Sequence, residues 1–258
     1  MNPLWCDFNN AETKEFLTSL EWGHLSGELV MDVGCGEGNM STKCILNLFP
    51  QIRKIIAIDI DPYCIQRSKI YHKHKKVEYR RADVTMMDEL QRWKRQFSKI
   101  VCANCITFIE EQERAFMNMF HLLKPGGQAA LFFTLKSESD DVYLEMNNKS
   151  KWTKYFQNLN SQMVQKLRKC DATYYQNVWE KIGFNVRFCK EQEADYVYGS
   201  DEEYKNGVRD STFIESIPKE LRREFVEESF STFLNLHPRN EAGLLSFRYV
   251  MIKALLKK

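Results

Sequence analysis

A segment in the first part of the chain combines glycines and an acid in a pattern suited to ligand binding. An apolar run at residues 29–33 contains Asp32 and leads into Gly34, Gly36 and Gly38, spaced Gly-x-Gly-x-Gly before an amphipathic stretch. Glycines let the backbone turn tightly and approach a ligand closely, and a following helix offers unpaired N–H groups and the positive end of its dipole. The segment therefore predicts a ligand-binding loop between a strand and a helix.

Two further acids follow apolar runs at corresponding places. Asp59 ends the second run and Asp83 follows the third, so both are expected at the carboxyl ends of strands. A carboxylate at the end of the second strand can accept hydrogen bonds from both hydroxyls of a ribose. Asn39 stands where a dinucleotide fingerprint, Gly-x-Gly-x-x-Gly, has its third glycine. The pattern therefore argues against a dinucleotide as the ligand.

The elements that would position these residues alternate between apolar runs and amphipathic stretches. The expected strands are residues 28–33, 54–59, 77–81, 99–103 and 128–135, and the expected helices are residues 39–49, 63–72, 87–95 and 111–123. Lys124-Pro125-Gly126-Gly127 is predicted to end the last of these helices and form a turn. This alternation predicts an α/β fold with a Rossmann-like, doubly wound and mostly parallel sheet.

The second half of the chain predicts a helical cap. Expected helices at residues 141–155, 157–181 and 218–236 accompany two more strands, at 185–189 and 246–255, which would complete a seven-stranded sheet. We expect a single domain over residues 1–258, with a cofactor-binding core at 1–135 and sheet completion with a substrate cap at 136–258. The aromatic residues of the expected cap favour a small, largely apolar acceptor. They are Tyr143, Trp152, Tyr155, Phe156, Tyr174, Tyr175, Trp179, Tyr196, Tyr198, Tyr204 and Phe213.

Composition narrows the function classes. Of the 258 residues, 43% are hydrophobic, which argues against disorder. The chain has 37 Lys and Arg against 35 Asp and Glu, and this net charge of +2 argues against a broad nucleic-acid-binding surface. The basic stretch at residues 67–81 is interpreted as a solvated helix and loop. No apolar segment is long enough for a membrane span, and acids among the first sixteen residues argue against a secretory signal. We therefore expect a cytoplasmic protein that binds neither membranes nor nucleic acid.

The cysteines predict neither metal binding nor nucleophilic catalysis. Eight cysteines in a chain without a signal peptide are expected to be free thiols, and the histidines offer no zinc-ligand spacing. Cys105 follows Asn104 without an adjacent cation that would lower its pKa, so a buried, inert thiol is the favoured interpretation. No Ser-His-Asp or Cys-His set is evident, and no catalytic acid or base is assigned.

The order of glycines and acids resembles that of class I S-adenosylmethionine-dependent methyltransferases. The resemblance implies that Asp59 holds the ribose and that Asp83 accepts a hydrogen bond from the adenine amino group. It also implies that the Val84 N–H faces the adenine ring and that the chain at Asn104 lies beside the sulfonium of the cofactor. It implies S-adenosyl-L-methionine as the cofactor. The residues expected to bind it are Asp32, Gly34, Gly36, Gly38, Asp59, Ile60, Asp83, Val84 and Asn104.

Beyond this motif, the chain resembles the juvenile hormone acid O-methyltransferases of arthropods. The runs that carry the resemblance are Glu111-Gln112-Glu113-Arg114-Ala115-Phe116, Phe120-His121-Leu122-Leu123, Asp141-Val142-Tyr143, Lys151-Trp152, Tyr196-Val197-Tyr198 and Ile217-Pro218-Lys219. The resemblance implies methyl transfer to the carboxylate of farnesoic acid, a juvenile hormone acid or a similar small hydrophobic acid. Such a carboxylate, with a pKa of about 4–5, is already ionised at neutral pH and needs no general base.

The acceptor residues depart from that family. Thr107 and Phe108 stand where the family has a His-Trp pair, and the amino-terminal segment offers Asn9 or Asn10 where the family has a glutamine that holds the acceptor carboxylate. We expect Thr107, Phe108, Trp152 and Tyr155 to line the acceptor pocket. Two alternatives stay open: a methyltransferase acting on a nucleic acid or protein nitrogen, and a catalytically silent homologue that keeps the cofactor.

Overall fold

The chain forms two compact units in a computed structural model that describes residues 3–156, 170–211, 214 and 216–258, with side chains from Ala11 onward. The sheet unit comprises residues 7–133, 171–191 and 252–258, and the helical unit comprises residues 1–6, 134–170 and 192–251. The carboxyl-terminal strands have residues in both units. The single domain with a core at residues 1–135 and a cap at 136–258 stays a prediction.

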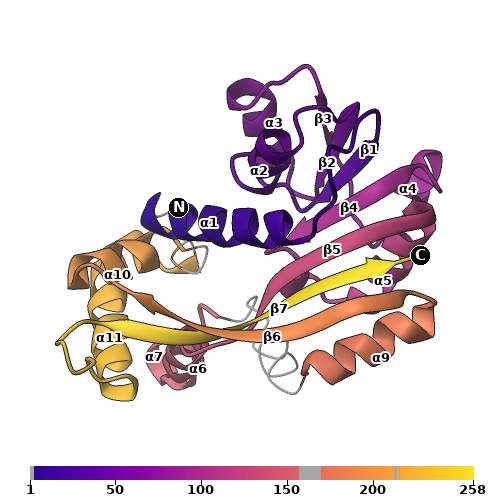
Figure 1. Cartoon of the computed structure of the whole chain (residues 1–258). Helices are drawn as coiled ribbons and strands as arrows, with labels where there is room; N and C mark the ends of the chain where they lie inside the picture. Colours follow the sequence, from indigo (N-terminus) through magenta and orange to yellow (C-terminus); the bar gives the residue numbers. More distant parts are fainter. Residues whose placement is uncertain (1–2, 157–169, 212–213, 215) are drawn as a thin grey trace. The chain divides into compact units, whose positions relative to one another are not determined.

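The sheet has seven strands in the order β3-β2-β1-β4-β5-β7-β6 (Figure 1). Their bounds are β1 Leu29–Val33, β2 Lys54–Asp59, β3 Val77–Arg81, β4 Phe97–Ala103, β5 Leu123–Ser137, β6 Asn185–Val197 and β7 Ser246–Lys257. Within the run β3-β2-β1-β4-β5, each strand pairs in parallel with the next. After β1 the chain adds strands toward one edge of the sheet (β2, β3), and from β4 it adds them toward the other edge. Ligands of such sheets bind between β1 and β4, where this order reverses, at the carboxyl ends of the strands.

Strand β7 runs against β5. The Gly126 N–H donates to the Lys258 carbonyl and the Lys258 N–H donates to the Gly127 carbonyl, both over 2.9 Å, so the start of β5 meets the end of β7. One antiparallel strand in an otherwise parallel arrangement confirms the prediction of a mostly parallel, seven-stranded sheet.

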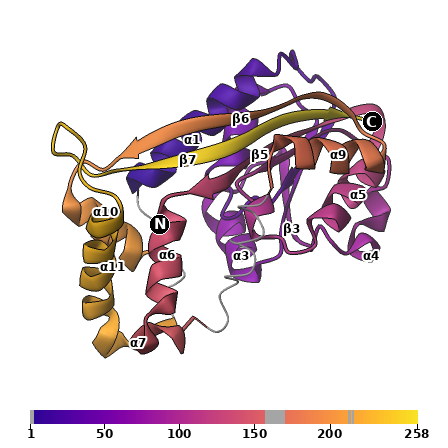
Figure 2. The ribbon, with the colours of Figure 1, turned by 90° about the horizontal axis from the view of Figure 1, so that it is seen from below.

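Both faces of the sheet are covered within the sheet unit. Helices α1 (Pro3–Ser19), α2 (Ser41–Leu48) and α3 (Pro62–Tyr71) lie on one face, and α5 (Gln112–Leu122) and α9 (Ala172–Ile182) lie on the other (Figures 1 and 2). Adjacent residues of β5 point to opposite faces. Phe132 contacts Phe16 of α1, with ring centroids 5.8 Å apart, whereas Phe133 contacts Tyr175 of α9 at 5.0 Å.

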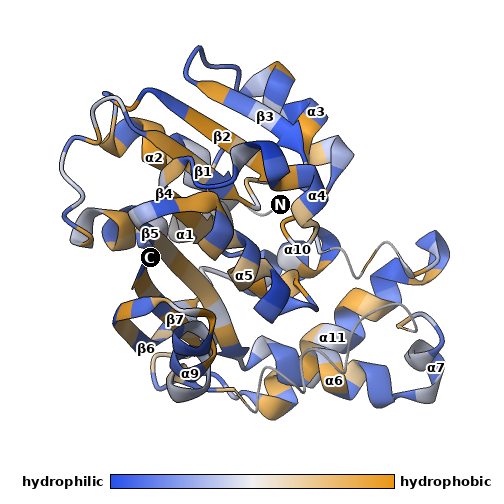
Figure 3. Cartoon of the chain, turned by 90° about the vertical axis from the view of Figure 1, so that its right-hand side faces the viewer, coloured by the Kyte–Doolittle hydropathy of each residue, from blue (hydrophilic) through white to orange (hydrophobic). Residues whose placement is uncertain are grey.

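The central strands owe their position to their apolar sequences. All five residues of β1 are buried, as are the four middle residues of β2. Figure 3 shows the middle of β2 in hydrophobic colours. Edge strand β3 contains two exposed arginines and is coloured mainly hydrophilic (Figure 3). The parallel strands are thus ordered by hydrophobicity, with β1 and β4 innermost.

The helical unit contains α6 (Ser139–Asn148), α7 (Ser150–Thr153), α10 (Asp201–Arg209), η4 (Lys219–Leu221) and α11 (Arg222–Leu236). Aromatic contacts hold these helices together, including Trp152 with Phe225 at 5.1 Å and Tyr204 with Phe233 at 4.8 Å. The buried Glu203 carboxylate accepts from the Tyr196 hydroxyl at 2.5 Å and from the Gly199 N–H at 2.6 Å. The unit therefore has an aromatic core of its own.

The predicted turn at residues 124–127 is wrong. Helix α5 ends at Leu122 and the chain enters β5 directly at Leu123. The pairing of β4 with β5 shifts between Phe97↔Leu123 and Lys99↔Gln128, so the glycines form an irregularity within the strand. Gly126, with φ +75°, bonds to Lys258 of β7, and this long-range pairing keeps the segment extended.

Several elements have other boundaries than those predicted. Helix 87–95 is a short α4 (Met87–Leu90) followed by η1 (Gln91–Trp93), helix 218–236 is η4 followed by α11, and strand 185–189 continues to Val197. Helix 141–155 is broken because Lys149 is extended, with ψ 122°. Helices α1 and α10 were not predicted. Residues 157–169 and Phe213 lie outside the described residues.

Three aromatic residues assigned to the cap, Tyr174, Tyr175 and Trp179, belong to the sheet unit. Tyr175 and Trp179 are fully buried and pack against Phe116, with ring centroids 6.2 and 5.5 Å away. Their place in α9 makes them core residues under β5, not acceptor-site residues. Among the described residues, no helix is long and apolar enough to cross a membrane.

Candidate functional site

The glycine loop after β1 has the backbone that its sequence predicts. Gly34, Gly36 and Gly38 have φ angles of +71°, +53° and +84°, which residues with a side chain rarely adopt. The N–H groups of Gly34 and Cys35 both donate to the Ile58 carbonyl, over 2.9 and 3.0 Å. The loop is therefore fastened to the end of β2, and its left-handed backbone explains the glycines.

The three glycines differ in the space beside them. A Cβ at Gly34 would lie 2.3 Å from the Cys105 Sγ, and a Cβ at Gly38 would lie 2.4 Å from the Tyr79 hydroxyl oxygen. A Cβ at Gly36 would meet nothing within 4 Å. Gly34 and Gly38 are thus required by packing inside the protein, whereas Gly36 borders open space that a ligand can enter.

Asp59 joins the ends of β1 and β2. Its Oδ2 accepts from the Gly36 N–H over 2.8 Å, and its Oδ1 accepts from the Asp61 N–H over 2.9 Å. Asp61 in turn caps α3 by accepting from the Tyr63 N–H at 2.8 Å. The carboxylate predicted to hold the ribose is therefore fixed beside the open glycine, and its assignment to the ribose stays a prediction.

Asp32 is buried beneath the loop. Its Oδ2 accepts from the hydroxyls of Ser41 and Thr42, at 2.8 and 2.5 Å, which ties β1 to the first turn of α2. Burial raises the pKa of Asp32 to about 6, against the opposing effect of these two hydrogen bonds. Its Oδ1 is buried and has no hydrogen-bond partner in the described part of the chain. Such an atom is suited to a cationic or hydrogen-bonding ligand group.

The Asp83 carboxylate forms hydrogen bonds within its own loop. The Asp83 Oδ1 accepts from the N–H and the hydroxyl of Thr85, each over 2.8 Å, and the buried Val84 accepts at its carbonyl from the Asn118 side chain. Ile60, which follows Asp59, is 56% exposed and presents an apolar surface at the end of β2. The adenine contacts of Asp83, Val84 and Ile60 remain predictions.

The chain after β4 brings the acceptor candidates to the same strand ends. Asn104 has φ +53° and donates its N–H to the Phe132 carbonyl at 2.7 Å. Thr107 and Phe108 follow in the short helix η2 (Ile106–Phe108), and the Phe108 side chain is 79% exposed. The prediction that Cys105 is buried is wrong, since it is half-buried against Gly34.

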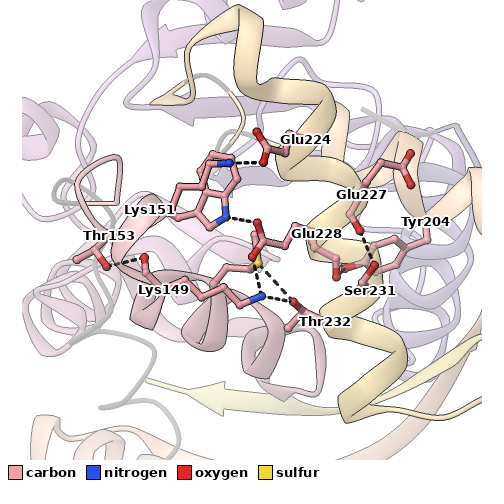
Figure 4. A network of polar contacts seen from close by, with 12 residues as sticks. Lys149, Lys151, Thr153, Tyr204, Glu224, Glu227, Glu228, Ser231 and Thr232 are labelled. Carbon is pink, nitrogen blue, oxygen red and sulfur yellow. Dashed lines mark hydrogen bonds and ion pairs between the residues drawn. The ribbon is translucent and has the colours of Figure 1, made fainter.

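Trp152 and Tyr155 lie in the helical unit, and the structure gives Trp152 a structural role there. The Trp152 side chain is fully buried, and its indole N–H donates to Glu228 on α11 over 2.7 Å. Lys149 forms an ion pair with the same carboxylate at 3.0 Å (Figure 4). Tyr155 is half-buried, with its ring centroid 6.3 Å from that of Trp152. Contact of either residue with an acceptor stays a prediction.

Sequence reasoning missed two residues that shape the site. Ser41 and Thr42 are buried at the start of α2, where their hydroxyls bond Asp32. The signal was present, since hydroxyl residues at a helix start following a strand acid suggest such a pairing. Among the described residues, no three His, Cys, Asp or Glu side chains gather in a way that could hold a metal ion.

Comparison with protein families and relatives places the chain among known sequences. The profile of a methyltransferase domain family matches residues 10–187. A juvenile hormone acid O-methyltransferase of Drosophila melanogaster is 21% identical over 228 residues, covering 86% of this chain and 76% of the relative. The enzyme of the same name from Bombyx mori is 22% identical over 224 residues, covering 83% and 77%.

Solved structures share the fold at low sequence identity. The YcgJ protein of a Bacillus species aligns with a TM-score of 0.64 at 15% identity, over 96% of this chain and 98% of that one. A phosphoethanolamine N-methyltransferase of Haemonchus contortus, in complex with S-adenosyl-L-methionine, aligns with a TM-score of 0.52 at 14% identity, over 93% of this chain and 51% of that one. At these identities the likeness extends to the fold alone.

Proposed function

The chain belongs to the methyltransferase domain family, and we propose that it transfers a methyl group from S-adenosyl-L-methionine to the carboxylate of a small hydrophobic acid, giving a methyl ester. Farnesoic acid and juvenile hormone acids are the first acceptors to consider, because the two relatives named for such an activity align over most of the chain.

The residues at the carboxyl ends of β1 and β2 fit this cofactor. Gly36 borders open space, Asp32 has an unpaired buried oxygen suited to an ammonium group, and the Asp59 carboxylate is held in place by two N–H groups. Gly34, Gly36 and Gly38 would hold the methionine part, and Asp59 the ribose. When bound, the cofactor supplies an electrophilic methyl group on a positively charged sulfur.

The chain's own residues then have to align the acceptor and exclude water. A carboxylate is already ionised near pH 7, so no residue has to remove a proton. Alignment of two reactants is itself a large source of rate acceleration. Asn104 fixes the backbone at the end of β4, and Thr107 and Phe108 follow it with one hydroxyl and one exposed apolar ring. These residues are suited to orient an apolar acid.

One observation carries the choice of a carboxylate acceptor, namely the length of the alignments with the two juvenile hormone acid O-methyltransferases. These alignments extend over 228 and 224 residues, whereas the domain profile matches residues 10–187. The likeness therefore includes much of the region after the cofactor-binding half. Acceptor specificity in this fold depends on residues added to the sheet, and shared fold alone does not determine it.

Matched acceptors test the proposal. The protein is incubated with S-adenosyl-L-methionine and either farnesoic acid, farnesol or farnesoic amide, which share one chain and differ in the polar group, and products are identified by mass spectrometry. We expect methyl farnesoate from the acid and no methylated product from the alcohol or amide. Methylation of the alcohol or amide at the rate of the acid would contradict a carboxylate-directed site.

A further inference from the structure

A largely buried ion pair lies under helix α1. The Lys253 Nζ of β7 lies 3.1 Å from the Glu12 Oε2 of α1, and the two side chains are only 11% and 15% exposed. Both residues belong to the sheet unit. Ion pairs removed from water gain little net stability, because desolvation of the charges offsets their attraction. Stability alone therefore explains this pair poorly.

The pair lies at the level of the candidate site. The Lys253 Nζ is 5.5 Å from the centroid of the Phe132 ring, and Phe132 of β5 is paired in register with Ala103, the last residue of β4. The Phe132 carbonyl accepts the N–H of Asn104. Lys253 is therefore close to the carboxyl end of β4, on the face of the sheet that α1 covers.

A neighbouring hydroxyl on α1 lacks a partner. Thr13 is buried on the sheet-facing side of α1, one turn before Phe16 and Leu17. Its Oγ1 makes no hydrogen bond to any residue that the structure describes. A buried hydroxyl without a partner is costly, and a ligand oxygen would satisfy it. The underside of α1 thus offers a cation and a free hydroxyl donor beside apolar rings.

We propose that Lys253 binds the carboxylate of the acceptor, with the Thr13 hydroxyl beside it, and that Glu12 occupies Lys253 when no acceptor is present. The inference rests on the proposed function, because it assumes an acidic acceptor. An ammonium group has three N–H donors, so it can bind an entering carboxylate while Glu12 gives way. Phe16 and Phe132 would contact the apolar chain of the acid.

The same arrangement favours product release. Methylation converts the acceptor carboxylate into a neutral ester, which no longer attracts an ammonium group. Glu12 remains charged and attached to α1, so it pairs with Lys253 again and displaces the ester. The ion pair therefore selects acids on entry and disfavours esters after reaction. It acts by charge competition within the site and requires no proton transfer.

Two variants with opposite expected effects test the inference. Lys253→Met removes the charge while keeping a long side chain, and Glu12→Gln removes the competing charge while keeping the shape. Binding of farnesoic acid and of methyl farnesoate is measured by calorimetry with S-adenosylhomocysteine present, alongside KM for the acid. We expect Lys253→Met to weaken acid binding roughly 10- to 100-fold and to leave ester binding unchanged. Glu12→Gln should strengthen acid binding and lower KM, and Lys253→Arg should retain acid binding.

The outcomes separate recognition from a structural clamp. If both variants weaken acid and ester binding alike and lower the melting temperature together, the pair only fastens α1 and the inference is wrong. If Lys253→Met forms ester with the KM of the wild type, the inference is again wrong while the proposed function stands. A wild-type protein that methylates no acid contradicts the proposed function, and the inference fails with it.

Discussion

Gly36 donates its backbone N–H to the Oδ2 of Asp59 over 2.8 Å, which joins the glycine loop after β1 to the carboxyl end of β2. The contact fixes a carboxylate next to the one glycine of the loop whose Cβ position is open. Preorganised groups bind a ligand without first losing conformational freedom. The relationship therefore links the two sequence signals, glycines and strand-end acids, in a single candidate binding site.

Replacing Asp59 should abolish cofactor binding. Asp59→Ala removes both expected hydrogen bonds to the ribose and the anchor of Gly36, so we expect the Kd of S-adenosylhomocysteine to rise by about 100-fold or more. Calorimetry measures the Kd, and circular dichroism checks the fold. Asp61→Asn is the matched control, since Asp61 caps α3 and should affect helix stability with little change in Kd. Unchanged affinity in Asp59→Ala would refute the ribose assignment.

The glycines should separate binding from folding. Gly36→Ala places a methyl group in open space, so the protein should fold with a backbone penalty of roughly 1–2 kcal/mol but bind the cofactor poorly. Gly34→Ala places that group against Cys105 and should lower the melting temperature much more. Thermal unfolding and cofactor titration measure the two effects. A Gly36→Ala protein with wild-type affinity would show that the open space is not part of the cofactor site.

Two acceptor candidates should behave differently because their surroundings differ. Phe108 is 79% exposed, so Phe108→Ala should leave the melting temperature unchanged and raise KM for the acid if the residue contacts the acceptor. Trp152→Phe loses the hydrogen bond to Glu228 in the core of the helical unit and should cost roughly 1–3 kcal/mol of stability. Steady-state kinetics and chemical unfolding measure these effects. A Phe108→Ala protein with unchanged KM would remove Phe108 from the acceptor site.

Asp32 should give the stability of the protein a defined pH dependence. Its folded-state pKa, raised to about 6 by burial, exceeds its ordinary value of 3.8, so the folded state binds the proton more tightly than the unfolded state. Its contribution is therefore fully present below pH 3.8 and is lost as pH rises through about 6. Relative to Asp32→Asn, the wild type should lose stability as the pH rises from about 3.8 to about 6 and change little above that, as measured by chemical unfolding at each pH.

A flat difference between the two proteins over that range would contradict the raised pKa. Ser41→Ala provides a second check, because it removes one of the hydrogen bonds that lower the pKa of Asp32. The loss of stability should then extend to higher pH. Ligand-free protein is used for both measurements, since a cationic ligand group at Asp32 would itself lower the pKa.

The elements that position the site follow directly from local sequence. The apolar residues of β1 and β2 identify buried parallel strands, and positive φ angles are expected for Gly34, Gly36 and Gly38 because only glycine adopts them at low cost. Local patterns are enough to predict these strands because each strand ends at a residue type that marks its end: glycines follow β1, and β2 ends at Asp59. The bond between Gly36 and Asp59 could not be predicted, because it depends on the register of two strands.

The predictions that failed concern segments governed by distant contacts. Lys124-Pro125-Gly126-Gly127 has the composition of a turn, but pairing with Lys258 at the far end of the chain keeps it in β5. Tyr175 and Trp179 lie in an aromatic-rich part of the sequence that predicts a substrate cap, but their helix packs under the sheet against Phe116. In each case tertiary structure overrides a local preference.

The most direct test of the central claim is the chemical nature of the methylated product. The protein is incubated with S-adenosyl-L-methionine carrying a labelled methyl group, together with farnesoic acid, long-chain fatty acids, RNA or a lysine- and arginine-containing peptide, and each product is then treated with alkali. We predict label in an organic-soluble product of an acid, released as methanol by alkali. Alkali-stable label in RNA or peptide, with none in any acid, would contradict carboxylate methylation.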